Sequence, residues 1–376
     1  MVVPTYGVQE WLPECLDSLL AQTHQRWRAV VVDDGSPDES GEIAESYADA
    51  DPRFRVLHTA NAGLGAARNA GAHHLAGDPH WRYLGFLDSD DVLPPNALAT
   101  LVGSLEASGS DFATGSILRW EAEPPLGLGL HEPPWMRRLH RPPRIGIGIG
   151  EHPEILGDVF AWNKLFRRSF WEGQGLSWPE GIRYEDQPTT TRAFLAGRFD
   201  VLPAHVYHWR IRTDGTSITQ QRSSLTDLRD RWVTKRMAWE SVRAHGDPHV
   251  SEVFLDRVLA GDLWRYFVTL PGCDDEWWRS LREGICELWS DRSLVHSGLP
   301  PVHRLCGWLV EQDRRADAEA LMRYLASLHG APVPRDSGST AGSRPTGGAA
   351  RLAVPPEVLD LSTVDPAALL LRDHEL

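Results

Sequence analysis

Short apolar runs alternate with helical stripes along the first 120 residues. Residues 8–24 place Leu12, Leu16 and Leu19 on one helical stripe. Apolar runs typical of strands lie at residues 28–34, 54–58, 83–88 and 111–120. Further helical patterns lie at residues 61–76 and 94–109. Strands that alternate with helices predict an α/β fold, with a mostly parallel sheet covered on both faces.

The pattern changes after residue 120. Residues 121–152 are rich in Pro, Gly, Arg and His and predict a long loop or flap. Residues 153–212 are mixed and end on a strand, whereas residues 223–329 have a helical period with many tryptophans, most of them expected in the core. Residues 331–351 are rich in Gly, Ser and Pro, which is typical of a flexible linker.

Both ends of the chain suggest a longer natural protein. Only Val2 and Val3 precede Pro4, although a buried strand usually has about five residues. The chain also ends on the apolar run "ALLLRDHEL". We therefore expect the natural chain to be truncated at both ends here.

Charge and cysteine content exclude some classes of protein. The net charge is −14, which disfavours general nucleic-acid binding because that needs a basic face. No stretch approaches the ~20 apolar residues of a membrane span. The four cysteines form no CxxC pair, which favours a reducing compartment. We expect a cytoplasmic protein, and leave open a peripheral association with the inner face of the plasma membrane and a homo-oligomer.

Two of the predicted strands end in acidic residues. Asp33 and Asp34 end one of them, and "FLDSDD" places Asp88 and Asp90 at the end of another. In open parallel sheets, ligands bind outside the carboxyl ends of the strands. Asp88 and Asp90 lie two residues apart and share one face of an extended segment, where paired carboxylates favour a cation. The pattern predicts Mn²⁺ or Mg²⁺; the alternative is a solvated Asp-rich turn that caps the next helix.

Four motifs occur in the order "VVPTYG", "VVVDDGSPDES", "NAGLGAARNAG" and "FLDSDD". Together they resemble the nucleotide-sugar half of a family 2 glycosyltransferase, whose fold is named GT-A and is Rossmann-like. The resemblance, together with the patterns after residue 120, predicts four parts. The helical period predicts that the third is a helical accessory domain, and the composition predicts that the fourth is a flexible linker with a truncated tail. The first two are the nucleotide-sugar-binding half (1–115) and the acceptor-binding half (116–222) of the GT-A domain. The helical domain has the bounds 223–330, and the linker with the tail has the bounds 331–376.

The resemblance also implies which residues bind a UDP-sugar donor. Tyr6 would offer a stacking face to the base, and Asp34, beside Asp33, would accept from the uracil imide N–H. Arg68 would reach the diphosphate or a carboxylate beside the metal. By residue type alone, the minor alternatives are that Tyr6 is a core aromatic and Arg68 a surface charge. The implied donor-binding residues of this half are Pro4, Thr5, Tyr6, Asp33, Asp34, Arg68, Asp88 and Ser89, with Asp90 as a metal ligand.

Transfer of a sugar to a hydroxyl needs a base that takes the hydroxyl proton. "YEDQP" offers Glu185 and Asp186 just before a helical pattern. The alternative is that both are ordinary acids at a helix N-terminus, stabilised by the helix dipole. The pair resembles the acceptor-side motif of the family, which implies that Asp186 is the base and that Glu185 helps to hold the acceptor.

The end of the strand at 200–212 carries further candidate residues, and another follows it. His208 is a candidate third metal ligand, with a structural histidine as the equal alternative. Arg210 or Arg212 could neutralise the departing diphosphate. Ser217, in "GTSI", is a candidate phosphate contact.

The stretch "FAWNKLFRRSFW" resembles the subgroup that builds bacterial wall polymers, including teichoic-acid-type transferases, which implies that Asn163 and Lys164 face the site. The leading hypothesis is an inverting, metal-dependent glycosyltransferase. It would move a hexosyl or N-acetylhexosaminyl group from a UDP-sugar to a hydroxyl of a polyol-phosphate or saccharide acceptor, such as a wall or capsule polymer. The alternatives are a sugar-nucleotide nucleotidyltransferase, although "PTYGVQEW" lacks a triphosphate loop, and a non-catalytic sugar-nucleotide-binding module.

Overall fold

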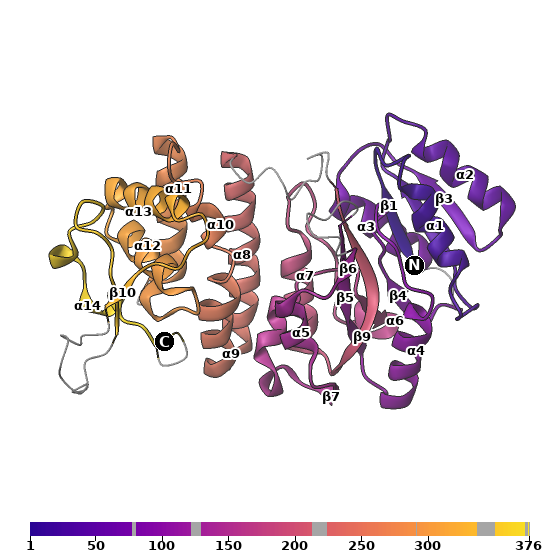
Figure 1. The fold of residues 1–376 in the computed structure, drawn as a ribbon. Coiled ribbons are helices and arrows are strands. Elements are labelled where there is room, and N and C mark those ends of the chain that lie inside the picture. The colour runs from indigo at the N-terminus through magenta and orange to yellow at the C-terminus, as the bar shows by residue number, and fades with distance from the viewer. Residues whose placement is uncertain are drawn as a thin grey trace. The chain divides into compact units, whose positions relative to one another are not determined.

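The structure is a computed structural model, and it describes residues 1–76, 80–121, 129–212, 224–290, 292–336, 350–372 and 375. The chain divides into two compact units (Figure 1). Unit 1 consists of Met1–Gln220 and Met237–Val250. Unit 2 consists of Gln221–Arg236 and Ser251–Leu376.

Unit 1 begins with a three-stranded parallel sheet in the order β1-β2-β3. Val2 of β1 also forms a parallel bridge with Phe86, directly after β4. Helix α3 packs on β1 and β2, and α2 packs on β2 and β3. The elements of this part are β1 (Val2–Thr5), α1 (Leu12–Leu20), β2 (Ala29–Asp33), α2 (Ser40–Ala50), β3 (Phe54–His58), α3 (Leu64–Ala76), β4 (Tyr83–Gly85) and α4 (Ala97–Ser108).

Apolar packing explains why these segments fold as predicted. Every residue of β2 is buried, and α1 buries Leu12, Leu16 and Leu19 along one stripe. Helix α3 approaches the sheet closely because residue 71 is Gly: a Cβ there would lie 2.4 Å from Val2 Cγ1. The predicted α/β class with a parallel sheet is confirmed for this half.

A six-stranded mixed sheet forms the rest of unit 1, in the order β4-β8-β5-β9-β7, with β6 paired to β5. Strands β5 and β9 run parallel along most of their length, side by side in Figure 1, whereas β4–β8, β5–β8 and β7–β9 are antiparallel. The further elements are β5 (Phe112–Glu121), β6 (Leu130–His131), α5 (Pro134–His140), β7 (Arg144–Ile147), η1 (Ile149–Glu151), η2 (Pro153–Gly157), β8 (Lys164–Arg167), α6 (Arg168–Gly173), α7 (Asp186–Ala196) and β9 (Phe199–Ile211).

The expectation of a long loop at 121–152 needs correction for the part that the structure describes, residues 129–152. This segment contains β6, α5 and β7, and Met136 and His140 of α5 are fully buried. Glu132 accepts a hydrogen bond from Ser116 and pairs with Arg137. The sequence misled because the Pro and Gly residues separate short elements rather than extend one loop.

Unit 2 is helical. Trp232, Trp277, Trp278 and Trp289 are buried, as expected for core residues, whereas Trp264 is exposed. Its helices, together with the end of α8 and the start of α9 that belong to unit 1, are α8 (Leu225–His245), α9 (Pro248–Val253), η4 (Phe254–Leu259), α10 (Trp264–Phe267), α11 (Asp275–Leu288), η5 (Leu294–His296), α12 (Pro301–Glu311) and α13 (Arg315–Ser327).

Residues 350–372 pack into unit 2. Leu352, Leu359 and Leu369 are buried, and α14 contacts α12. The elements here are β10 (Arg335–Asp336), β11 (Arg351–Leu352), η6 (Leu361–Thr363) and α14 (Pro366–Leu369). Residues 337–349, most of the predicted linker, lie outside the described residues. The four-part division of the chain stays a prediction.

Among the described residues, no helix is both long and apolar enough to cross a membrane.

Candidate active site

Arg68 joins the two acidic motifs that the sequence singled out. It lies on α3, its side chain is only 2% exposed, and Nη2 donates to Asp88 Oδ1 at 2.7 Å. Nη1 donates to Glu185 Oε1 at 2.5 Å. A single guanidinium therefore bridges the end of β4 and the loop before α7, two segments that lie far apart in the sequence. Burial opposes its charge, but Asp88 and Glu185 outweigh this and raise the pKa of Arg68.

The next residue, Asn69, fixes the acceptor-side loop to the same helix. Its amide donates to the Trp178 carbonyl and to Glu180, both at 2.8 Å, and accepts from the Trp178 N–H at 2.9 Å. Gly65 allows this close approach because a Cβ there would lie 2.1 Å from the Pro179 carbonyl oxygen. The motif "GLGAARNAG" thus holds the loop as well as supplying Arg68.

Asp91 organises the acid motif from within. It is 2% exposed and accepts from the Tyr207 hydroxyl at 2.8 Å and from the Arg210 backbone N–H at 2.6 Å. Burial, together with the charges of Asp90 and Asp88, raises its pKa well above the ordinary value. The Tyr207 hydroxyl also accepts from the Asp88 N–H at 3.1 Å. β9 therefore holds the motif in place through Asp91.

Asp90 is paired with an arginine from the end of β9. Its Oδ2 lies 2.7 Å from Arg212 Nη2, and its backbone carbonyl accepts from Arg210 Nε at 2.8 Å. Burial raises the pKa of Asp90, Arg212 lowers it, and Asp88 raises it further; the net direction is up. The Arg210 guanidinium pairs with Glu14 of α1 and lies 4.1 Å from the Trp120 ring centroid.

The acceptor-side acids follow a strained residue. Tyr184 has a φ of 63°, a left-handed value that is costly for an aromatic residue. Glu185 is 5% exposed, and burial raises its pKa to about 7 although Arg68 lowers it. The carboxylate of Glu185 is bound to Arg68, which ties the start of α7 to α3. The predicted contact of Glu185 with an acceptor stays a prediction.

Asp186 is the first residue of α7, and its Oδ1 accepts from the Gln187 N–H at 2.9 Å. Two buried cations feel its charge, Arg68 and Lys164.

Asn163 and Lys164 are both buried, and the expectation that they face the site stays a prediction. Lys164 Nζ pairs with Asp158 Oδ1 at 2.9 Å and donates to the Phe160 carbonyl at 2.8 Å. Asn163 donates to the Gly115 carbonyl at 2.9 Å. Burial lowers the pKa of Lys164, although Asp158 and Asp186 oppose this. Asn163 and Lys164 thus form buried polar contacts that hold the backbone at the start of β8.

Residues 1–172 match a family model described as glycosyl transferase family 2. The uncharacterized glycosyltransferase EpsJ of Bacillus subtilis (strain 168) is 34% identical over 223 residues, which are 56% of this chain and 60% of EpsJ. The putative glycosyltransferase EpsH of the same organism is 33% identical over 226 residues, 59% of this chain and 62% of EpsH. The matched region thus spans about three fifths of the length of these curated relatives.

A solved structure shares the fold of most of this chain. The crystal structure of S. aureus TarS 1-349 in complex with UDP-GlcNAc superimposes with a TM-score of 0.69. The match covers 94% of this chain and 95% of that one at 17% identity. At this identity the likeness shows the fold, which confirms the predicted GT-A class followed by a helical region.

Among the predicted base-binding residues, Tyr6 is exposed and the others are buried. Tyr6 is 53% exposed, so the alternative of a core aromatic is wrong. Pro4 and Thr5 are buried in β1. Asp34 is 3% exposed and already accepts from the N–H groups of Ala62 at 3.0 Å and Gly63 at 2.8 Å. Its predicted contact with uracil would share oxygens that hold this loop, and it stays a prediction.

Asp33 has a different environment from its neighbour Asp34. Its Oδ1 accepts from the Ser36 N–H at 3.0 Å, and its Oδ2 lies 2.9 Å from His58 Nδ1. Burial raises the pKa of Asp33, but these hydrogen bonds outweigh it and the net direction is down. Asp33 is therefore ionised near neutral pH and shapes the turn after β2.

The chemistry of Asp88 and Asp90 fits a divalent ion, because Mg²⁺ and Mn²⁺ prefer one or two carboxylates together with substrate phosphates. Within the described ranges, no three His, Cys, Asp or Glu side chains are arranged to hold a metal. His208 pairs through its backbone with Val92, and burial lowers the pKa of its ring, which favours the neutral form that a ligand needs. Its role as a metal ligand stays a prediction.

Two other predicted donor residues can be placed only in part. Ser89 is buried within the acid motif, at 5% exposure. Ser217 lies outside the described residues.

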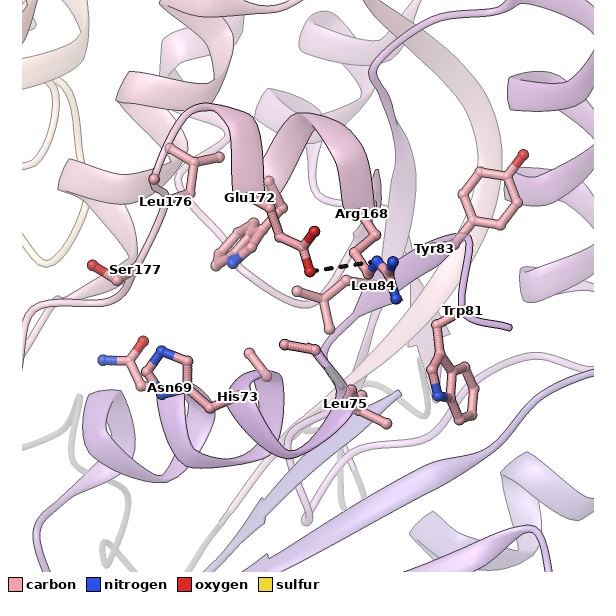
Figure 2. A pocket seen from close by; sticks show the side chains of 14 residues that line it. Asn69, His73, Leu75, Trp81, Tyr83, Leu84, Arg168, Glu172, Leu176 and Ser177 are labelled. Atoms are coloured by element: carbon pink, nitrogen blue, oxygen red, sulfur yellow. Dashed lines mark ion pairs between the residues drawn. The ribbon is translucent and has the colours of Figure 1, made fainter. Parts of the chain in front are cut away.

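A cavity of about 250 Å³ lies beside α3 and α6, apart from the acidic motifs (Figure 2). Trp81 and Tyr83 lie at one end, and Asn69 and His73 line it from α3. The ion pair between Arg168 and Glu172 lies above them in this view. The residues that line it include none of those predicted for donor, metal or base, so the cavity is not the predicted active site.

Sequence reasoning missed the parts of this site that are made by tertiary contacts. Asn69 lies next to Arg68 in the quoted motif, so its position was a usable signal. Tyr207 and Glu14 carried no signal of their own, because only the packing of β9 and α1 against the acid motif reveals their roles.

Proposed function

We propose that this chain is an inverting glycosyltransferase that moves a sugar from a UDP-sugar to a hydroxyl of its acceptor. The observation that carries the proposal is the bridge of Arg68 between Asp88 and Glu185, because it unites the donor-side and acceptor-side motifs in one site. The match of residues 1–172 to the family model of glycosyl transferase family 2 supports the same reaction class.

In the proposed reaction, Asp186 takes the proton of the acceptor hydroxyl, and the oxygen attacks C1 of the sugar as its bond to UDP breaks. Arg68 holds Asp88 in position at the donor and Glu185 beside the base. Mn²⁺ or Mg²⁺, held by Asp90, would supply positive charge to the leaving diphosphate when bound. The arginines at the end of β9 would add to that charge.

The identities of the donor and the acceptor have less support than the reaction class. UDP-GlcNAc and UDP are bound in TarS structures that share the fold, which favours a uridine nucleotide. The acceptor we propose is a hydroxyl of a wall or capsule polymer, either polyol phosphate or saccharide. We place the reaction in the cytoplasm, at or near the inner face of the plasma membrane.

The test measures UDP release from UDP-sugars, with GDP- and CDP-linked compounds as comparison, in Mn²⁺, in Mg²⁺ and in EDTA. Asp186→Asn should lower transfer by about 10²- to 10⁴-fold, the usual effect of losing a general base, while UDP binding stays unchanged. Gln187→Ala, at the next position of α7, is the matched control and should keep transfer within a few-fold.

Full turnover by the Asp186→Asn variant would reject Asp186 as the base. Equal turnover in EDTA would reject the metal. A dependence on pyrophosphate would identify the nucleotidyltransferase alternative, and nucleotide binding without turnover of any donor would identify the binding module.

A further inference from the structure

Arg212 occupies the carboxylate that the proposed function assigns to the metal. Its Nη2 lies 2.7 Å from Asp90 Oδ2, and the two side chains are only 13% and 23% exposed. The carbon at the centre of the guanidinium lies 4.2 Å from the centroid of the Trp11 ring, which precedes α1. Arg212 therefore lies between the acid motif and the segment that begins α1.

The position of Arg212 is fixed by the backbone around it. The Arg210 N–H binds Asp91 at 2.6 Å, and Arg210 Nε binds the Asp90 carbonyl at 2.8 Å. The backbones of His208 and Val92 form an antiparallel bridge. The end of β9 is thus attached to the acid motif at several points, which keeps the Arg212 backbone close to Asp90.

Each acid of the Asp88–Asp90 pair has its own arginine. Arg68 binds Asp88 from the buried side, and Arg212 binds Asp90. Each arginine gives its carboxylate a cationic partner, which offsets part of the repulsion between the two neighbouring carboxylates. A divalent ion at Asp90 would meet the positive charge of Arg212 at the same carboxylate, so each cation would weaken the binding of the other.

We propose that Arg212 is an internal cation that competes with the divalent metal for Asp90 and transfers to the diphosphate when the nucleotide arrives. The proposal rests on the proposed function for its donor and its metal. A metal alone must displace Arg212 without compensation. A metal together with a diphosphate gives the displaced guanidinium a new anionic partner. Metal and nucleotide therefore bind cooperatively, and Arg212 is the source of the coupling.

The experiment measures free Mn²⁺ by electron paramagnetic resonance, with and without saturating UDP, and needs no turnover. Arg212→Gln should bind Mn²⁺ alone roughly 5- to 10-fold more tightly than the unmodified chain, the low end of typical coupling between ligands. It should also lose most of the increase in Mn²⁺ affinity that UDP causes. Arg212→Lys keeps the charge and should bind Mn²⁺ alone much as the unmodified chain does.

Arg82→Gln is the matched control, because Arg82 forms an exposed ion pair with Glu106 at 3.0 Å. It should leave Mn²⁺ affinity unchanged. Asp90→Asn should abolish the binding of Mn²⁺ in both conditions, which identifies Asp90 as the shared ligand.

Two failures are distinguishable. If the unmodified chain binds Mn²⁺ no better with UDP than without, the metal and donor of the proposed function are wrong. If UDP raises Mn²⁺ affinity but Arg212→Gln and Arg212→Lys both bind Mn²⁺ alone like the unmodified chain, the competition is wrong and the proposed function stands.

Discussion

Among the described residues, unit 1 and unit 2 each bury one arginine almost completely, and the two arginines have different roles. Arg68 is 2% exposed and Arg304 is 1% exposed. Arg68 binds Asp88 and Glu185, two carboxylates from distant segments. Arg304 binds Glu375 with both Nη atoms, the Leu299 carbonyl at 2.9 Å and the Leu370 carbonyl at 3.0 Å.

The partners of the two arginines differ in charge state. Burial raises the pKa of Glu185 to about 7, and Arg68 only partly offsets this. Burial also raises the pKa of Glu375, but the hydrogen bonds from Arg304 and the Arg372 backbone N–H outweigh it, and its pKa falls to about 2. Arg304 thus has a permanently ionised partner, whereas Arg68 is shared by acids that crowd one another.

This difference separates a structural use of buried charge from a functional one. Arg304 attaches the C-terminal segment to α12 and needs only a stable pair. Arg68 attaches two motifs whose remaining charges must stay available for a substrate. Crowded acids cost stability, and sites that keep such a cost are typical places for function.

The largest effect is expected for Arg68→Met. Loss of the guanidinium leaves Asp88 and Glu185 without their partner, which should lower the free energy of unfolding by about 3–5 kcal/mol. Transfer should fall at least about 10²-fold, because misplacing reacting groups by an ångström has that effect. Arg68→Lys keeps one charge without the fork, so both losses should be smaller. Thermal unfolding and UDP release measure the two quantities, and a variant with normal transfer would contradict the proposed bridge.

Arg304→Met should lose as much stability as Arg68→Met but should keep transfer. Breaking this buried pair should lower the free energy of unfolding by about 3–5 kcal/mol, because Glu375 and two carbonyl groups lose their donor. UDP binding should stay unchanged. Arg323→Gln is the surface control, since Arg323 is 59% exposed and pairs with Glu319; it should change stability by less than about 0.5 kcal/mol. Equal loss of UDP binding in Arg304→Met and Arg68→Met would erase the distinction between the two arginines.

The smallest effect is a change of pH profile in Glu185→Gln. Ionised Glu185 binds Arg68, so transfer should fall several-fold as pH drops from 8 to 6 and Glu185 takes up a proton near pH 7. Gln cannot titrate, and the variant should lose this limb. The folded pKa lies above the unfolded one, so the stability that this group contributes is complete below about pH 4.5 and is lost as pH rises through about 7.

Glu375→Gln is the control for that profile. The pKa of Glu375 falls to about 2, below the range tested, so the variant should keep the pH dependence of the unmodified chain between pH 6 and 8. An unchanged acidic limb in Glu185→Gln would assign the titration to a different group.

Local pattern predicted most of the fold and the chemistry of the site. The buried strand β2, the amphipathic helix α1 and the acid motif after β4 were all readable, because side-chain periodicity reports which face of an element is buried. The segment 129–152 and the C-terminal segment 350–372 were not readable. Their compositions suit loops, and only contacts with distant residues give them a fixed structure.

The sequence by itself determined which residue types the site contains: carboxylates at the ends of strands, an arginine on α3 and an acid pair before α7. Only the tertiary structure decided how they are paired. Arg68 meets Glu185 across 117 residues of chain, and Arg212 meets Asp90 across a similar span. The reason is physical: periodicity depends on neighbours along the chain, whereas an ion pair depends on where the packed sheets bring remote side chains together.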